Sequence, residues 1–300
     1  IRAGEANLIL AGGTETMSGA AMLLPSAVRN GIKMGDFKVV DHMILDGLWD
    51  AYNDYHMGIT AENIAEKYSI SREEQDKFAA ASQTKAAKAQ DAGMFKDEIV
   101  PVSIVSRKET IVFENDEFIN RATNFEKLSA LRPAFKKDGT VTAGNASGIN
   151  DGAAYVLVAS EEAVKKYNLT PLVEVVSVGQ GGVDPAIMGM GPVPAIKNAL
   201  DKAGMKLNEM EVLELNEAFA AQSLGVIKQL CEDHGVTKEF FDEKCNKNGG
   251  AIALGHPIGA SGNRIIVSLI HEMKRSNNKY GLASLCIVGG MGTAIIIKNI

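Results

Sequence analysis

The sequence predicts a layered α/β fold, and three observations support that prediction. From about residue 152 onward, strand-like segments alternate with segments of helical periodicity. Two apolar segments far apart, 7–11 and 282–290, each run into a Gly-Gly pair, which hints at a duplicated unit. The first is expected to be a short buried strand that ends at Gly12 and Gly13. Between them, residues 18–148 have mixed charge and many methionines and are expected to form an inserted lobe.

The composition is typical of a globular protein with two domains or lobes. The chain has 300 residues, of which 46% are hydrophobic and 23% charged, and a net charge of -6. This charge argues against nucleic acid or an anionic membrane as the main partner, and no uncharged apolar run approaches the roughly 18 residues of a membrane span. The three cysteines lack a CxxC pair, which indicates neither a disulfide framework nor a zinc site and favours a reducing, cytoplasmic location.

The lobe is expected to hold two helices and two strands. The longer helix starts at Ser71, where Glu74 completes a capping box, and it stops at Gly93. The shorter helix and the two strands are expected at residues 60–68, 98–105 and 110–113.

After the lobe, the expected elements alternate regularly. Strands are expected at residues 153–159, 172–178, 212–215, 282–288 and 293–298. Helices are expected at residues 194–203 and 217–232, and another begins near Ala260.

The segment GGAIALGHPIGASG, residues 249–262, is the strongest candidate for a functional site. It carries no charge, and its glycines allow sharp turns and close backbone approaches. Pro257 prevents a helix from running through His256. We therefore expect a histidine on a rigid, dry loop just before a helix, which suits a base that stays neutral near neutral pH.

Three more residues each allow a structural and a functional interpretation. Asn216 is either the N-cap of the following helix or a ligand-binding residue at the carboxyl end of a strand. Cys286 is either a buried small side chain or a thiol that faces a cavity, with backbone N–H groups beyond it for an oxyanion. Ser147 lies either in a flexible linker or in a backbone platform for an extended ligand.

Together these segments resemble the thiolase family, and the matches span essentially the whole chain in order. They are AGGTETMS at 11–18, HMGITAEN at 56–63, LRPAF at 131–135, AGNASGINDGAA at 143–154, MGMGPVPA at 188–195, NEAFA at 216–220, GGAIALGHPIGASG at 249–262 and CIVGGMG at 286–292. The resemblance implies a layered α-β-α-β-α fold. Residues 171–300 would be the complete C-terminal half, residues 1–17 and 150–170 a remnant of the N-terminal half, and residues 18–149 a loop lobe that contacts CoA.

The resemblance also implies a reaction. It is the Claisen condensation of two acetyl-CoA molecules to acetoacetyl-CoA and CoA, with thiolysis as its reverse, through an acyl-cysteine in a ping-pong mechanism. His256 would take the proton of the nucleophilic cysteine, and Cys286 would move the α-proton of the second acetyl group. Asn216 would order a water that forms one oxyanion hole with His256, and backbone N–H groups near Gly289 would contribute to a second. CoA thioesters would be the substrates, without a cofactor or metal.

The nucleophile of the family is expected upstream of Ile1. The chain opens without Met, and none of its three cysteines matches the motif of the nucleophile. We therefore expect the part with the nucleophile, and nearly all of the N-terminal half, to be absent from this chain. Cys231 and Cys245 lie in a segment that looks longer than usual for the family and are assigned no role. Val288 replaces a frequent Gly and would be strained if its φ were positive.

The resemblance extends to candidates for binding the substrate. His56 and Met57 resemble the short-chain, biosynthetic branch, in which this pair closes on the pantetheine end of CoA; otherwise they form an ordinary entry into a helix. Residues expected to line the same pocket, or else to pack in the core, are Met188, Ala218 and Phe219. Basic side chains that could meet the phosphates and adenine of CoA, or simply be solvated, are Arg121, Lys127 and Arg132.

The leading hypothesis is an acyltransferase of the short-chain branch, a homotetramer built from two dimers. One alternative is a broader 3-ketoacyl-CoA thiolase of fatty-acid degradation. A second, of a different class, is an inactive CoA-binding fragment. A ketoacyl synthase is disfavoured because that relative has a second histidine at the position of Asn216.

Overall fold

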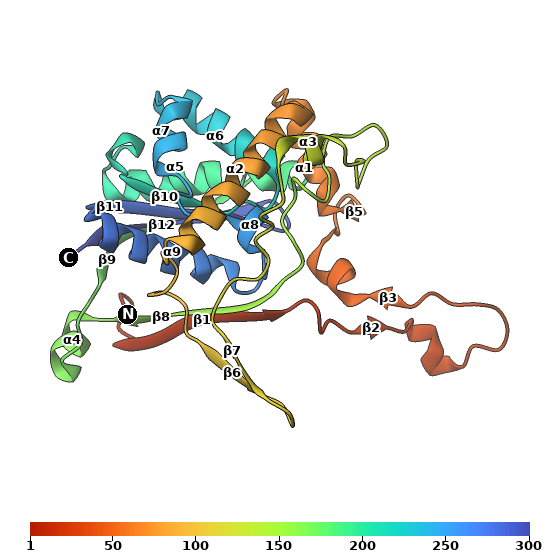
Figure 1. Ribbon diagram of the computed structural model, residues 1–300, viewed down its shortest axis with the longest axis horizontal. Helices are drawn as coiled ribbons and strands as arrows, with labels where there is room; N and C mark the ends of the chain where they lie inside the picture. Colours follow the sequence, from red (N-terminus) through yellow and green to blue (C-terminus); the bar gives the residue numbers. More distant parts are fainter.

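Two β-sheets with a helix between them form the body of the protein (Figure 1). The computed structural model describes residues 1–300. The larger sheet has the order β10-β11-β12-β9, and only its β10–β11 pair is parallel. The smaller sheet is the antiparallel pair β1–β8. The strands are β10 Val212–Leu215, β11 Tyr280–Ile287, β12 Met291–Asn299, β9 Val173–Gly182, β1 Leu8–Thr16 and β8 Asp151–Ala159.

Helix α9 (Ser261–Ser276) is the layer between the sheets. It contacts β10 and β11 on one side and β1 and β8 on the other. Its residues Ile265, Leu269 and Met273 follow helical spacing and pack with residues of the larger sheet. Helix α5 (Pro192–Ala203) packs against β9 and β12 of that sheet, with α6 (Ala220–His234) beside it. The resulting order of helix, sheet, helix and sheet confirms the layered α/β prediction.

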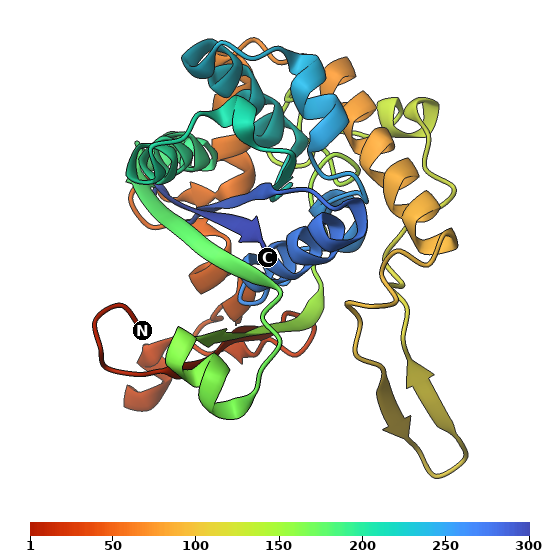
Figure 2. The same ribbon diagram turned by 90° about the vertical axis from the view of Figure 1, so that its left-hand side faces the viewer.

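The lobe packs on this body through its helices. Helices α1 (Met57–Lys67) and α2 (Arg72–Asp91) contact α6, whereas residues 18–47 form an arm that projects from the body (Figure 1). The hairpin of β6 (Val102–Val105) and β7 (Thr110–Phe113) also projects (Figure 2). The shorter elements are β2 Met22–Leu23, η1 Ser26–Asn30, β3 Val40–Asp41, η2 Met43–Gly47, β4 Trp49–Asp50, β5 Tyr55–His56, α3 Phe125–Ser129, α4 Glu161–Tyr167, η3 Pro185–Met190, η4 Leu207–Glu209, α7 Lys238–Lys244 and α8 Ala251–Leu254. None of the helices combines the length and the apolar character that crossing a membrane requires.

The capping signals of the long lobe helix are confirmed. Ser71 Oγ accepts from Glu74 N at 3.2 Å, and a Glu74 carboxylate oxygen accepts from Ser71 N at 2.8 Å. The helix ends at Asp91, and Gly93 follows with a φ of 69°. The alternating elements after residue 152 are also found, and β10 has the predicted bounds.

The prediction of a buried strand over residues 7–11 was wrong. Strand β1 continues through both glycines to Thr16, and Leu10 is 68% exposed. The glycines serve close packing instead of a turn. A Cβ on Gly13 would collide with the carbonyl oxygen of Gly259, and one on Gly12 with the ring of Tyr155.

Three element starts differ from the prediction by three residues or more. The helix expected from residue 217 starts at Ala220 with Phe219 as N-cap, so Asn216 does not cap it. The helix expected from residue 60 starts at Met57, because His56 caps it. The strand expected from residue 98 starts only at Val102, after a turn.

Candidate active site

A segment at the end of the lobe pairs with the segment that follows β10, and together they form a small platform. Ser147 N donates to Ala218 O at 3.0 Å, and Ala220 N donates to Asn145 O at 2.8 Å, around a bridge between Ala146 and Phe219. The side chain of Asn145 is fixed in turn by the buried carboxylate of Asp76, to which Nδ2 donates at 2.9 Å. The segment with Ser147 is therefore an ordered part of the core and not a flexible linker.

Asn216 and Cys286 lie at the same edge of the larger sheet. Strands β10 and β11 run parallel, so their carboxyl ends meet there, and Asn216 N continues the pairing by donating to Ser284 O at 3.0 Å. Asn216 is 1% exposed, and its Nδ2 lies 3.3 Å from Nε2 of His256. The structure thus joins two candidates that are 40 residues apart in sequence.

The loop of His256 is held by the smaller sheet. Gly255, with a φ of 95°, follows helix α8, and a Cβ there would collide with Asn150. His256 N donates to Asn150 Oδ1 at 3.2 Å, and Gly259 N donates to Glu15 Oε2 at 3.1 Å. These contacts give the loop the rigidity that its sequence predicts.

The surroundings of His256 define one protonation state. Its Nδ1 lies 2.6 Å from Ser261 Oγ, and Ser261 Oγ donates to Pro257 O at 2.9 Å. Because the hydroxyl hydrogen goes to the carbonyl, Oγ accepts from Nδ1–H, and the unprotonated Nε2 accepts from Asn216 Nδ2. Burial, followed by the positive charge of Arg264, lowers the pKa of His256 to about 4. The imidazole is therefore neutral near neutral pH.

Asn216 has one further feature that points to a ligand. Its Oδ1 is buried without a hydrogen-bond partner, although its Nδ2 faces His256. Buried amide oxygens are normally paired with protein or ordered water. This oxygen is therefore available to accept from a water or from a substrate.

Cys286 is buried in the largest apolar cluster of the protein. Burial raises the pKa of its thiol to about 12, so the thiol is the resting form. The same apolar cluster contains Met57, Met188, Ala218 and Phe219. After the strand, Gly289 and Gly290 adopt φ values of 92° and 90°, whereas Val288 does not have positive φ and carries no such strain.

His56 caps helix α1, and its ring also stacks on an aromatic side chain. Its Nδ1 accepts from Gly58 N at 3.0 Å, which is the ordinary entry into a helix. Its ring also stacks on Phe135 with centroids 4.7 Å apart, and Phe135 meets Phe219 edge-on at 6.1 Å. Burial lowers the pKa of His56. The capping and stacking contacts together tie the His56–Met57 pair to Phe219.

The basic candidates of the lobe make contacts within the lobe. Arg121 pairs with Asp91 at 2.8 Å and donates to Gln90 Oε1 at 2.8 Å. Lys127 Nζ donates to Ala122 O at 2.7 Å. Arg132 lines an open pocket of about 370 Å³, together with Lys136 and Lys137. None of these contacts joins the lobe cations to His256 or Cys286.

Several side chains that position the site were not singled out from the sequence. Ser261 and Glu217 lie inside matched motifs, and that location was the only signal for them. Asn150 and Phe135 also lie inside matched motifs, at 143–154 and 131–135, whereas nothing in the local sequence marks Asn246. Their partners lie in remote segments, so only the fold reveals them.

Comparison with known proteins places the whole chain in one family. The family models described as "Thiolase, N-terminal domain" and "Thiolase, C-terminal domain" match residues 1–162 and 169–299. An acetyl-CoA acetyltransferase of Cupriavidus necator is 55% identical over 300 residues, which cover 100% of this chain and 74% of that protein. Because the N-terminal model itself matches this chain, the expected loss of the part with the nucleophile is not confirmed.

Solved structures of related enzymes share the fold of this chain. The acetyl-CoA acetyltransferase from Syntrophomonas wolfei superposes with a TM-score of 0.95 at 45% identity, over 99% of this chain and 74% of that one. A human mitochondrial 3-ketoacyl-CoA thiolase in complex with CoA gives a TM-score of 0.90 at 47% identity, over 99% and 72%. With both domain models matched and the fold shared, the chain belongs to the thiolase family.

Proposed function

We propose that the protein is an acetyl-CoA C-acetyltransferase. It would condense two acetyl-CoA molecules to acetoacetyl-CoA and CoA and catalyse the reverse thiolysis. The observation that carries the proposal is the chain of contacts from Ser261 through His256 to Asn216, which presents a neutral imidazole and an unpaired amide oxygen at the end of a strand. The acetyl-CoA acetyltransferase of Cupriavidus necator, 55% identical, supports the same reaction.

In thiolysis, His256 acts first as a base. Its Nε2 takes the proton of the nucleophilic cysteine, and the thiolate attacks the C3 carbonyl of acetoacetyl-CoA. The C2–C3 bond then breaks, and its electron pair passes to the enolate of acetyl-CoA. Protonated Nε2 and a water held by Asn216 Oδ1 donate to the enolate oxygen, where the negative charge develops.

Cys286 completes the reaction as the second acid and base. Its raised pKa keeps a proton on sulfur, and that proton passes to C2 of the enolate to give acetyl-CoA. CoA then takes the acetyl group from the acyl-cysteine, and its thiol proton passes to Cys286. The nucleophilic cysteine leaves as a thiolate and regains its proton from protonated His256. The N–H groups of the turn at Gly289 and Gly290 are proposed to hold the thioester oxygen.

The short-chain substrate is proposed from the side chains around this site. Phe219, Met188 and Met57 are all buried in the cluster that contains Cys286, which favours a small acyl group. The second candidate is a broader 3-ketoacyl-CoA thiolase, since such a human enzyme is 47% identical. Ser147 and the lobe cations, including Arg121, would contact the rest of CoA.

Assembly and location are also proposals. The arm over residues 18–47 exposes many apolar side chains, Met34 to 96%, and such an arm favours association into the homotetramer expected from the family resemblance. The three cysteines are free thiols, which supports a reducing, cytoplasmic location. The position of the nucleophile ahead of Ile1 stays a prediction, and intact mass tests it against the 31.9 kDa of the 300 residues.

The activity test uses two cysteine variants and two substrates. We expect thiolysis of acetoacetyl-CoA and little turnover of a long-chain 3-ketoacyl-CoA. Cys286→Ala should lower kcat about 10²- to 10⁴-fold, the usual contribution of a general acid or base. Cys231→Ala, half-buried on α6, is the matched control and should retain wild-type activity. Rapid turnover of the long chain would favour the second candidate, and full activity of Cys286→Ala would exclude the proposed role of Cys286.

A further inference from the structure

Glu217 is a buried carboxylate that the proposed mechanism does not use. It is 2% exposed, and three donors converge on it. Ser82 Oγ donates to Oε2 at 2.6 Å, Asn246 Nδ2 donates to Oε1 at 2.9 Å, and Ile252 N donates to Oε2 at 3.3 Å. These donors come from α2, from the segment before α8, and from α8 itself.

The contacts make Glu217 the cap of the helix that leads to His256. Helix α8 is one turn long, and its N-cap, Gly250, has no side chain to satisfy the free N–H groups. Glu217 accepts directly from Ile252 N. Ser82 Oγ, which donates to Glu217, accepts from Gly250 N at 3.0 Å. A Cβ on Gly250 would collide with this carboxylate, so the two backbones are closely packed.

The same residue also fixes the chain on the side of Asn216. Asn246 Nδ2 donates both to Glu217 and to Leu215 O at 2.8 Å, and Asn246 Oδ1 accepts from Leu215 N at 2.9 Å. Asn246 thus binds both Leu215, the last residue of β10, and Glu217. These are the two neighbours of Asn216 in the chain, so the backbone of Asn216 is held on both sides.

We propose that Glu217 is a positioning residue that fixes the Asn216–His256 pair by joining the end of β10 to the helix that precedes His256. One residue away from it, Asn216 Nδ2 lies 3.3 Å from His256 Nε2. Because Glu217 is bonded covalently to Asn216 and through hydrogen bonds to α8, it sets the separation of the two segments. The proposal rests on the proposed function for its kinetic consequence only.

A carboxylate is required at this position because every partner is a donor. The side-chain amide of Asn246 is unable to flip, because its Oδ1 accepts from Leu215 N and its Nδ2 donates to Leu215 O. The hydroxyl of Ser82 accepts from Gly250 N, so its hydrogen goes to Glu217. A glutamine would set its NH₂ group against a donor in either orientation, leaving at least one buried group unpaired.

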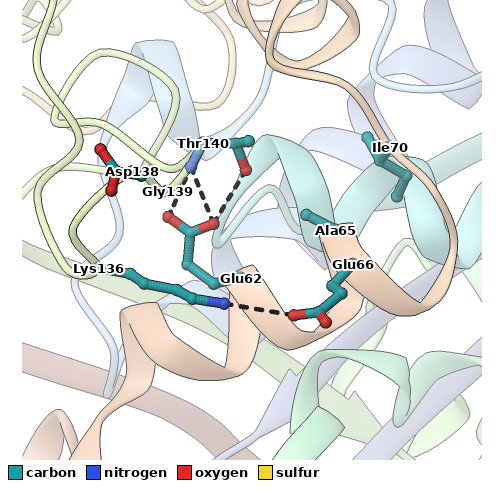
Figure 3. A pocket seen from close by; sticks show the side chains of 8 residues that line it. All are labelled: Glu62, Ala65, Glu66, Ile70, Lys136, Asp138, Gly139 and Thr140. Carbon is teal, nitrogen blue, oxygen red and sulfur yellow. Dashed lines mark hydrogen bonds and ion pairs between the residues drawn. The ribbon is translucent and has the colours of Figure 1, made fainter.

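The matched control is a second buried carboxylate, Glu62 on α1 (Figure 3). It accepts from Thr140 N at 2.8 Å, from Thr140 Oγ1 at 3.0 Å and from Val141 N at 2.8 Å. It lines a pocket of about 230 Å³ between α1 and the loop over residues 136–140, and none of its bonds reaches Asn216 or α8. Glu62→Gln therefore disrupts a comparable set of buried hydrogen bonds and leaves the contacts of Asn216 and His256 unchanged.

The experiment compares Glu217→Gln and Glu62→Gln in the protein that contains this chain. The first readout is NMR of protein with ¹⁵N-labelled histidines, with the signal of His256 identified through its absence in His256→Asn. We expect the Nε2 resonance of His256 to shift in Glu217→Gln and to stay in place in Glu62→Gln, although both melting temperatures fall. The second readout is thiolysis, where kcat of Glu217→Gln should fall about tenfold to hundredfold, because an error of about 1 Å in position has that effect. Its KM should change far less.

An unshifted Nε2 resonance in folded Glu217→Gln would overturn the proposal. If that variant does not fold, Ser82→Ala takes its place, because it removes one donor and the link to Gly250 while keeping the carboxylate. It should shift the same resonance by a smaller amount, and no shift would again overturn the proposal. If the wild-type protein lacks thiolysis, the proposed function fails, and the NMR comparison still decides the role of Glu217.

Discussion

At the scale of single residues, His256 shows how a neutral base is maintained. Burial lowers its pKa to about 4, and Ser261 holds the proton on Nδ1. Asn216 then faces the unprotonated Nε2 at 3.3 Å. Two hydrogen bonds and a dry environment therefore set both the charge and the tautomer of the imidazole.

Ser261→Ala should separate these contributions. Without the hydroxyl, Nδ1–H loses its buried acceptor, and the ring can rotate or change tautomer. We expect kcat for thiolysis to fall about tenfold, in line with a hydrogen bond of about 1.4 kcal/mol. Steady-state kinetics measure this. Ser276→Ala, at the far end of α9, is the control and should behave as the wild type. Equal kcat values for the two variants would contradict the assigned role of Ser261.

At the scale of elements, the loop before α9 depends on its fit against β1. Gly13 lies in the middle of that strand, and there is no space for a side chain between it and the carbonyl oxygen of Gly259. Gly152 of the paired strand is packed in the same way, since a Cβ added to it would lie 2.8 Å from Cγ of Pro257. The smaller sheet thus supports the loop of His256.

Gly13→Ala should therefore affect both stability and catalysis. The added methyl group has to push the strand and the loop apart, at a cost of about 1–3 kcal/mol. We expect a melting temperature several degrees lower in calorimetry and a reduced kcat, since the loop of His256 moves. In Gly182→Ala the new methyl group meets only Gly290 O at 3.9 Å, and φ is not positive, so this control should be nearly neutral. A Gly13→Ala protein with wild-type stability would contradict the prediction, because it would show that the loop of His256 moves away from β1 without a cost in free energy.

At the scale of the whole molecule, buried charges join the lobe to the body. Glu98 and Asp116 of the lobe lie near Arg264 of α9, and Arg264 is 3.7 Å from the buried Glu214 of β10. Burial raises the pKa of Glu98 to about 7 and that of Glu214 to about 8, although the charge of Arg264 opposes both shifts. Ser268 donates to Glu98 at 3.4 Å, and Arg275 also lies nearby.

These raised pKa values predict that the free energy of unfolding decreases as the pH rises. The folded state binds more protons than the unfolded state between about pH 4.5 and 8, so the contribution of these carboxyls is complete below that window and is lost through pH 7 and 8. Glu98→Gln should show a smaller fall in melting temperature from pH 6 to pH 8 than the wild type. Glu161→Gln, on the exposed helix α4, is the control and should follow the wild-type curve. Identical curves for Glu98→Gln and the wild type would contradict the assignment.

Local signals were sufficient for many elements of this fold. The capping box at Ser71, the glycine after α2 and the four-residue strand β10 depend on neighbouring residues alone, and all three are found. Strand β1 was misjudged because its apolar residues suggested burial, whereas Leu10 is exposed in a sheet of only two strands. The start of α6 was misjudged because an Asn-Glu pair is typical of a helix start, yet residues 218–220 pair with residues 145–147 instead.

The sequence by itself determined the layered fold class and the family, because motifs and periodicities are properties of short segments. It also marked His256, Asn216, Cys286 and Ser147 as candidates. Only the tertiary structure decided which atoms meet. The 3.3 Å contact of Asn216 with His256, the support of the loop by β1, and the place of Glu217 between them all join segments distant in sequence. Such contacts arise from packing of the whole chain, so no local pattern could specify them.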